Sequence, residues 1–362
     1  MIGYKRSSLS AVIAIALAAT LGTSVPAASQ DSHLYKGLEA RTIGPATMSG
    51  RIAAVDVVES DPNHIYVGAA SGGVWHSIDG GATWEPLFDN QPVASIGALA
   101  INQNNPDIIW VGSGEGNVRN SVSVGDGVYK SLDGGKTWNN MGLPDSEHIN
   151  RIALDPTNPD VAYVAAMGHL WSDGGERGVY KTTDGGETWQ LILAGENVQT
   201  GATDIKMDPE NPNNLFASMW QFRRYPDYFE SGGPGSGLHV SHDGGETWRE
   251  LTEEDGLPKG DLGRSVFTIA PSDTNTIYAL VEAKKSAIIR SDDGGRTWRQ
   301  VNKDKGIANR PFYYMELLVD PNDKETVYNI ATTLNVSNNG GKNFENISSV
   351  NCCSDPRGLH ID

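Results

Sequence analysis

The sequence is poor in cysteine and in basic residues, and each shortage excludes a class of protein. Its two cysteines, Cys352 and Cys353, are neighbours near the end of the chain. They provide no disulfide framework and no cysteine-based zinc pattern, and their redox state stays open. Lysine and arginine number 28 against 45 acidic residues, which gives a formal charge of −17. Nucleic acid and anionic membrane surfaces are therefore poor candidates as partners.

Long apolar runs are also scarce, and the clearest one lies near the start, from Ala11 to Gly22. It follows Lys5 and Arg6 and precedes the small residues of Val25–Ser29, an order typical of a secretory signal peptide. The run is too short for a transmembrane helix. We predict a signal peptide over 1–29, a secreted or periplasmic location, and no membrane span after its removal. Loss of the two basic residues takes the formal charge to −19.

No stretch shows a sustained helical period, but one phrase recurs: Ser-x-Asp-Gly-Gly-x-Thr-Trp. It stands at 77–84, 131–138, 182–189 (with Thr first), 241–248 and 291–298. A sixth copy at 337–344 has Asn339 and Asn343 in place of the Asp and Thr. The copies lie 46 to 59 residues apart, and a period of this length indicates a repeat architecture.

The phrase is expected to form a tight hairpin turn. Its carboxylate accepts backbone N–H groups, Gly-Gly allows positive φ, and Thr-Trp opens the next strand. The repeated acids are therefore predicted to be structural: Asp79, Asp133, Asp184, Asp243 and Asp293.

Each repeat can be divided into four short strands. In the third repeat these are 151–155, 161–166, 179–182 and 188–193, with a Pro-Thr-Asn-Pro turn after the first. An aromatic residue marks the second strand of every repeat: Tyr66, Trp110, Tyr163, Phe216, Tyr278 and Tyr328. Such spacing predicts an all-β fold, a β-propeller of four-stranded blades.

The predicted propeller spans 51–362 and comprises six repeats plus the start of a seventh. Residues 30–50 form an N-terminal segment that is a candidate for ring closure. The final residues, 358–362, align with the first strand of the third repeat. Because an open propeller exposes a sheet edge, we favour a propeller that is incomplete at its C-terminal end over a closed ring of six blades.

The repeated phrase resembles the Asp-box, or BNR repeat, of sialidases, xyloglucan-degrading hydrolases, the sortilin/Vps10 luminal domain and a photosystem assembly factor. The stretch Arg41–Arg51 and the Asp-Pro-x-Asn-Pro turns are similar to those of large secreted bacterial proteins with sortilin-like repeats. The resemblance covers nearly the whole mature chain. It implies the propeller fold, whereas the box itself is structural in these families and does not define a function.

Strand direction assigns the turns to faces. Strands alternate, so the Asp-boxes share one face with the turns after the first strands, and the irregular connections lie on the opposite, variable face. Binding residues usually lie on such variable loops. The loops at 113–127, 167–178 and 220–237 carry our candidate binding residues: Glu115, Arg119, His169, Trp171, Trp220, Arg223, Arg224, Tyr225 and Tyr228. Alternatively, these loops pack on one another and cap the channel.

A second candidate group comes from aligning the first strands. Arg151, Asp204 and Glu316 occupy matching positions in repeats three, four and six, where other repeats have Ala54, Ala98 and Val266. If first strands line the channel, the three charges meet there. We favour an internal salt-bridge cluster over a catalytic site.

Sugar or peptide ligands suit aromatic platforms with carboxylates and arginines, so we predict a propeller that binds peptide, protein or glycan. The alternative is a xyloglucanase-like glycoside hydrolase module that needs more chain. The acid that such enzymes place before a Gly-Gly pair is absent from 69–73, and the sialidase Phe-Arg-Ile-Pro motif is absent too. An assembly factor is a third possibility. The histidines show no metal spacing, and we predict neither metal nor cofactor.

Overall fold

The computed structural model describes residues 51–118, 122–313 and 315–348. Almost all regular structure in these residues is β, with one short 3-10 helix, η2 (Glu253–Asp255), between two blades. In this part of the chain no helix has the length and apolar character needed to cross a bilayer. The predicted signal peptide, the segment 30–50, the strand at 358–362 and both cysteines lie outside the described residues.

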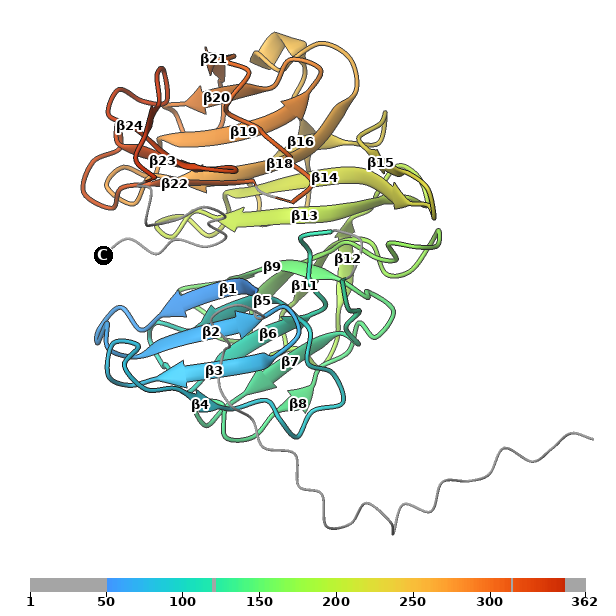
Figure 1. The fold of residues 1–362 in the computed structure, drawn as a ribbon, viewed down its shortest axis with the longest axis vertical. Coiled ribbons are helices and arrows are strands. Elements are labelled where there is room, and N and C mark those ends of the chain that lie inside the picture. Colours follow the sequence, from blue (N-terminus) through green and yellow to red (C-terminus); the bar gives the residue numbers. More distant parts are fainter. Residues whose placement is uncertain (1–50, 119–121, 314, 349–362) are drawn as a thin grey trace, which may run out of the picture. The chain divides into compact units, whose positions relative to one another are not determined.

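Every repeat forms one antiparallel sheet whose strands are neighbours in sequence order (Figure 1). Blade 1 contains β1 (Ile52–Val57), β2 (Ile65–Ala69), β3 (Gly73–Ser77) and β4 (Glu85–Pro86). Blade 2 contains β5 (Ile96–Ile101), β6 (Ile109–Ser113), β7 (Val128–Ser131) and β8 (Asn139–Asn140). Blade 3 contains β9 (Ile149–Leu154), β10 (Ala162–Ala166), β11 (Gly178–Thr182) and β12 (Gln190–Leu193).

The next three blades repeat this order, and blade 4 adds one strand. Blade 4 contains β13 (Thr200–Met207), β14 (Leu215–Arg224), β15 (Phe229–Ser231), β16 (Gly237–Ser241) and β17 (Arg249–Glu250). Blade 5 contains β18 (Leu262–Ile269), β19 (Ile277–Ala283), β20 (Ala287–Ser291) and β21 (Arg299–Asn302). Blade 6 contains β22 (Glu316–Val319), β23 (Val327–Ile330), β24 (Leu334–Ser337) and β25 (Glu345–Asn346). The predicted β-propeller with four-stranded blades is confirmed.

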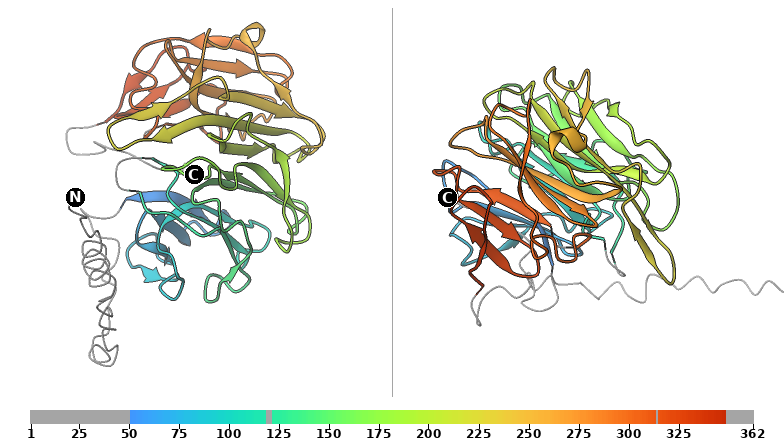
Figure 2. Two further views of the ribbon diagram at one scale, coloured as in Figure 1. Left: turned by 90° about the vertical axis from the view of Figure 1, so that its right-hand side faces the viewer. Right: turned by 90° about the horizontal axis from the view of Figure 1, so that it is seen from above.

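Figure 2 shows the arrangement of the blades from two further directions. Apolar side chains pack between successive blades. Between blades 1 and 2, for example, Tyr66, Val74 and Phe88 pack against Ile96 and Val111. Equivalent buried clusters lie at the next four interfaces. The strand-two aromatics of blades 1 to 5 belong to these clusters, where a large ring covers the facing sheet. Tyr328 of blade 6 is half-buried.

The two kinds of regular turn lie side by side, as strand direction predicts. In all six blades a glycine N–H of the box donates to a carbonyl oxygen in the turn between the first and second strands of the same blade. Gly80 N to Asn63 O is 3.1 Å, and Gly340 N to Glu325 O is 2.8 Å. This end of the blades is called the Asp-box face below, and the opposite end the variable face.

Candidate functional site

The Asp-box carboxylates are engaged in holding their own turns. In blade 1, Asp79 Oδ1 accepts from Thr83 N and Ser77 Oγ, each at 2.8 Å, and Oδ2 accepts from Thr83 Oγ1 at 2.7 Å. Gly80 and Gly81 have φ of 67° and 90°, the left-handed conformation that glycine adopts at little cost. The same arrangement recurs at Asp133, Asp184, Asp243 and Asp293.

These hydrogen bonds favour the ionised carboxylates. The bonds from the box threonines, hydroxyl first and then backbone N–H, lower the pKa of Asp79, Asp133, Asp184 and Asp243 to about 2. The sixth box keeps the Asn343 N to Asn339 Oδ1 bond at 3.0 Å. All six turns are thus built in the same way, whether or not the central residue carries a charge, which favours a structural role.

On the variable face, Arg177 organises the loop 167–178. Its guanidinium donates to Gly174 O at 2.6 Å, Met167 O at 2.7 Å and His169 O, and it lies 5.2 Å from the Phe222 ring. Burial lowers the pKa of Arg177 to about 10. The planar fork of arginine suits several carbonyl acceptors at once, so this loop has a fixed shape although it has no regular secondary structure.

The predicted loop 220–237 is largely a hairpin. β14 continues three residues beyond its pairing with β13 and pairs with β15, so that Arg224 lies opposite Phe229. Trp220 and Phe222 are fully buried and stack at 4.7 Å. They form an apolar cluster on the variable face with Val118, Met167 and Leu170. The alternative that these loops pack on one another therefore holds for Trp220.

The exposed part of this region is aromatic and charged. Trp171 is 47% exposed and Tyr228 is 49% exposed, and Tyr228 stacks on Tyr225 at 4.3 Å. Arg223 lies 5.1 Å from the Tyr225 ring and its Nε lies 3.2 Å from Asp173 Oδ1. Arg224 N donates to Leu170 O at 2.9 Å, which holds the hairpin against the loop that carries Trp171.

Arg224 and His169 are both held by neighbours. The Arg224 guanidinium lies 4.5 Å from the Phe229 ring, and burial lowers its pKa. His169 contacts Ser172 Oγ through Nδ1 at 2.7 Å and Asp145 Oδ1 through Nε2 at 2.9 Å. The candidate side chains of loops 167–178 and 220–237 thus gather between blades 3 and 4.

The candidate binding residues of the loop 113–127 do not form part of the exposed surface. Glu115 is 1% exposed and accepts from Arg51 Nε at 3.0 Å. Asn117 Oδ1 accepts from Arg264 Nη2 at 3.0 Å. Both side chains therefore link blades instead of facing solvent, and Arg119 lies outside the described residues.

The three aligned charges of the first strands do meet. Arg151 Nε donates to Asp204 Oδ1 at 3.1 Å, and Arg151 Nη2 contacts Glu316 Oε1 at 3.0 Å. Asp204 is fully buried, and its Oδ2 also accepts from Phe267 N at 2.7 Å. One ionic network thus joins β9, β13 and β22 with β18. Because every partner is engaged, the arrangement suits a structural role.

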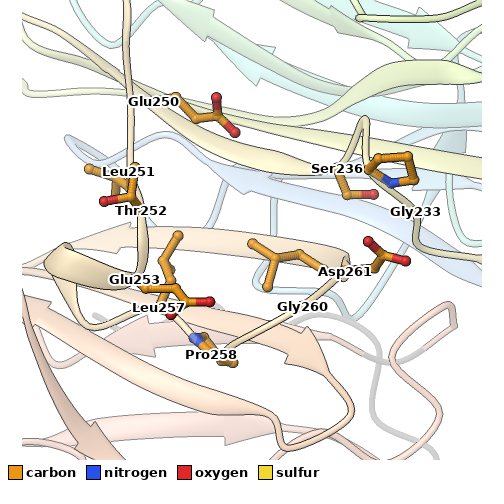
Figure 3. Close-up of a pocket in the computed structure, with 12 residues that line it drawn as sticks. Gly233, Ser236, Glu250, Leu251, Thr252, Glu253, Leu257, Pro258, Gly260 and Asp261 are labelled. Carbon is orange, nitrogen blue, oxygen red and sulfur yellow. The ribbon is translucent and has the colours of Figure 1, made fainter.

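The variable face also has a pocket that we did not predict from the sequence. A cavity of about 280 Å³ lies between Gly233–Ser236 and the connection from β17 to β18 (Figure 3). Glu250, Glu253 and Asp261 line it together with apolar residues such as Leu257. Burial, followed by the nearby Glu196, raises the pKa of Glu250. Neither segment alone has a motif that would have indicated this pocket.

The described residues hold no group of three or more side chains suited to a metal ion.

The sequence is similar to those of several known proteins. The sortilin/Vps10 family model (sortilin, neurotensin receptor 3) matches residues 126–285. A xyloglucanase from a Paenibacillus species is 26% identical over 223 residues, which are 56% of this chain and 21% of that protein. Xyloglucanase Xgh74A of Acetivibrio thermocellus is 29% identical over 150 residues, 35% of this chain and 16% of that protein.

Solved structures agree on the fold. The GH74 enzyme of Niastella koreensis superimposes with a TM-score of 0.60 at 20% identity, covering 80% of this chain and 45% of that one. A structure of YCF48 bound to D1 peptide gives 0.53 at 17% identity, covering 88% and 90%. The resemblance to the Asp-box β-propellers is confirmed. The chain spans about a fifth or less of the length of the xyloglucanases it matches. The solved structures are 17–20% identical, so their similarity establishes the fold alone.

Proposed function

We propose that this propeller is a secreted or periplasmic binding module that recognises a peptide, protein or glycan on its variable face. The proposal is carried by the exposed rings of Trp171 and Tyr228, together with the half-buried Tyr225 on which Tyr228 stacks. Exposed apolar surface rimmed by polar residues is typical of interaction sites. These rings also have apolar faces that can stack on a sugar ring or cover an apolar peptide side chain.

The surroundings of this group favour recognition over chance exposure. The buried Trp220–Phe222 stack and the Arg177 fork fix the backbone that carries the three rings. A ligand therefore meets a surface that is already ordered, which lowers the entropic cost of binding. Arg223 and His169 add polar groups at its edge.

The relatives are compatible with both ligand classes. Those similar in sequence are xyloglucanases, and one propeller of similar fold was solved with a peptide. We therefore expect binding to be found in a screen that contains both xyloglucan oligosaccharides and peptides.

The test is a binding screen with matched surface variants. Trp171→Ala and Tyr228→Ala should each weaken binding by about 1–3 kcal/mol. The control Leu132→Ala removes a 61% exposed side chain from the Asp-box face and should leave binding unchanged. Equal losses in all three variants, or no loss in the first two, would contradict a site at this position.

A second candidate function, a xyloglucanase-like module, is favoured by the pocket at Glu250. A carboxyl group with a raised pKa is suited to act as a general acid in glycoside hydrolysis, and a second carboxylate is needed as its partner. Glu253 and Asp261 lie in the same pocket. Release of reducing sugar from xyloglucan that is lost in Glu250→Gln, but kept in Trp171→Ala, would support this function over pure binding.

A further inference from the structure

The blades are joined on the Asp-box face by a repeated lysine contact. In blade 2, Lys130 pairs across the strands with Trp110, and its Nζ lies 4.6 Å from the ring centroid. In blade 3, Lys181 pairs with Tyr163 in the same way, at 5.4 Å. Both ammonium groups therefore lie over the face of a strand-two aromatic, where the ring quadrupole attracts a cation.

Each of these lysines also reaches the next blade. Lys130 Nζ donates to Gly185 O and Lys181 Nζ donates to Gly244 O, both at 2.9 Å. Gly185 and Gly244 are the first glycines of the following Asp-boxes. The propeller thus contains two internal examples of one binding mode, in which an alkylammonium group lies between an aromatic ring and an Asp-box carbonyl.

Blade 1 has the same strand-two aromatic and is followed by the same Asp-box glycine, but it has no lysine at this position. Its matching residue is His76, which pairs with Tyr66 and stacks on it at 4.0 Å. An imidazole is shorter than a lysine side chain, and no described residue donates a hydrogen bond to Gly134 O, the equivalent carbonyl. Instead, a cavity of about 500 Å³ lies between Tyr66 and His76 on one side and Asp133 and Gly134 on the other.

The polar groups of this cavity suit a cation. Asp160 is a carboxylate that interacts favourably with Lys130. The equivalent residue one blade earlier is Asp107, which lines the cavity beside His76. Asp61, Glu85 and Asp133 also line the space, against one lysine, Lys136, and the imidazoles of His64 and His76. Burial, followed by the charge of His64, lowers the pKa of His76, which favours its uncharged ring.

Tyr66 is suited to receive the ligand. It is only 3% exposed, and no described residue forms a hydrogen bond with its hydroxyl, although it lines the cavity. The corresponding Tyr163 hydroxyl donates to Gly244 O at 3.1 Å, beside Lys181. Among the described residues, the buried Nε2 atom of His76 also has no hydrogen-bond partner.

We propose that the cavity between blades 1 and 2 on the Asp-box face binds a primary alkylammonium group. Its nitrogen takes the hydrogen-bonding position at the Asp-box carbonyl that the Lys130 and Lys181 ammonium groups occupy in the next two blades. Because the His76 imidazole already covers the Tyr66 ring, the ammonium group lies beside the Tyr66 hydroxyl and donates to that oxygen and to Gly134 O. Its alkyl chain runs along the His76 side of the cavity. The source is either a lysine side chain of a polypeptide or a small free amine. This site lies on the face opposite the proposed binding surface and does not depend on it.

The experiment uses n-butylammonium as the probe and measures saturable binding by NMR. The variant His76→Lys should fill the cavity with its own side chain and raise the unfolding temperature. It should also weaken butylammonium binding about 10- to 100-fold, as expected for losing charge-assisted hydrogen bonds to Gly134 O and the Tyr66 hydroxyl. The matched variant Lys130→His should open an equivalent cavity between blades 2 and 3, lower the unfolding temperature, and add a second butylammonium site that restores it.

Butanol, which has the chain without the charge, is the control ligand. Equal binding of butanol and butylammonium, or unchanged butylammonium binding in His76→Lys, would overturn the proposal. Nα-acetyl-lysine methylamide separates the two sources. If it competes with butylammonium, the site accepts a lysine side chain within a polypeptide, and if only free amines bind, the site serves small amines.

Discussion

Replacing Arg151 by methionine should destabilise the propeller substantially, because this side chain joins three blades. The change removes hydrogen bonds to Asp204 at 3.1 Å and to the two Glu316 oxygens at 3.0 and 3.1 Å. Hydrogen bonds to charged groups contribute about 1.5–3 kcal/mol each. The Arg151 and Glu316 side chains are 27% and 26% exposed, so water recovers part of the loss. We expect a fall of about 2–3 kcal/mol in the free energy of unfolding.

The assay is urea unfolding followed by the fluorescence of the nine tryptophans. Lys259→Met is the control, since it removes an ion pair with Glu253 in which both side chains are largely exposed, and should cost about 0–1 kcal/mol. In a double-mutant cycle, Arg151→Met and Glu316→Gln should show a coupling of about 1 kcal/mol. Stability of Arg151→Met within about 0.5 kcal/mol of the native protein would refute the assignment of Arg151 as a structural link between blades.

Three further predictions follow from the packing and protonation of individual side chains. Trp220→Ala should lower the free energy of unfolding by about 3–5 kcal/mol in the same urea assay, whereas the exposed Trp171→Ala should leave it nearly unchanged. Burial lowers the pKa of His148 and of His239 to about 4. Between about pH 6.5 and 4 the unfolded chain therefore binds protons that the native chain does not, so the free energy of unfolding should fall as the pH drops through this range. In the double variant His148→Gln/His239→Gln, the urea midpoint should depend less on pH across the same range. In Arg177→Lys the new ammonium group lacks the planar guanidinium that donates to three carbonyl oxygens, so limited proteolysis should cut within 167–178 faster than in the native protein. Arg296→Lys, at an exposed position, is the control and should leave the cleavage rate unchanged.

The fold was predictable because its determinants are local and repeated. The Gly-Gly pair of the box can form only a few tight turns, and in blade 3 the predicted strands 161–166 and 179–182 agree with β10 and β11 to within one residue. The meeting of Arg151, Asp204 and Glu316 was predictable for a related reason. Matching positions in radially repeated strands face the same axis, so alignment alone brings their side chains together.

The variable face was predictable in position but not in detail. Trp220 and Trp171 are both tryptophans of irregular segments, yet one is fully buried and the other is 47% exposed. What separates them is the register of β14, which turns Trp220 towards Met167 and Leu170, and nothing in 220–237 alone determines that register. The Glu250 pocket is lined by two separate segments, 233–236 and 250–262, and the His76 cavity by residues of blades 1 and 2. Their volumes therefore depend on how these segments pack, which no local motif specifies.

The hydrogen bond between the box glycine and the turn after the first strand limits where segments can be inserted into a blade. In blade 4 the chain adds the whole β14–β15 extension, yet Gly244 N still lies 2.9 Å from Asn213 O, as close as in blades without an addition. Each blade is therefore fastened at one end and open to insertion at the other. We expect that new segments, natural or grafted, can be added at exposed positions of this face such as 226–227 without disturbing the register of the strands beneath, provided that Arg177 and Trp220 are kept.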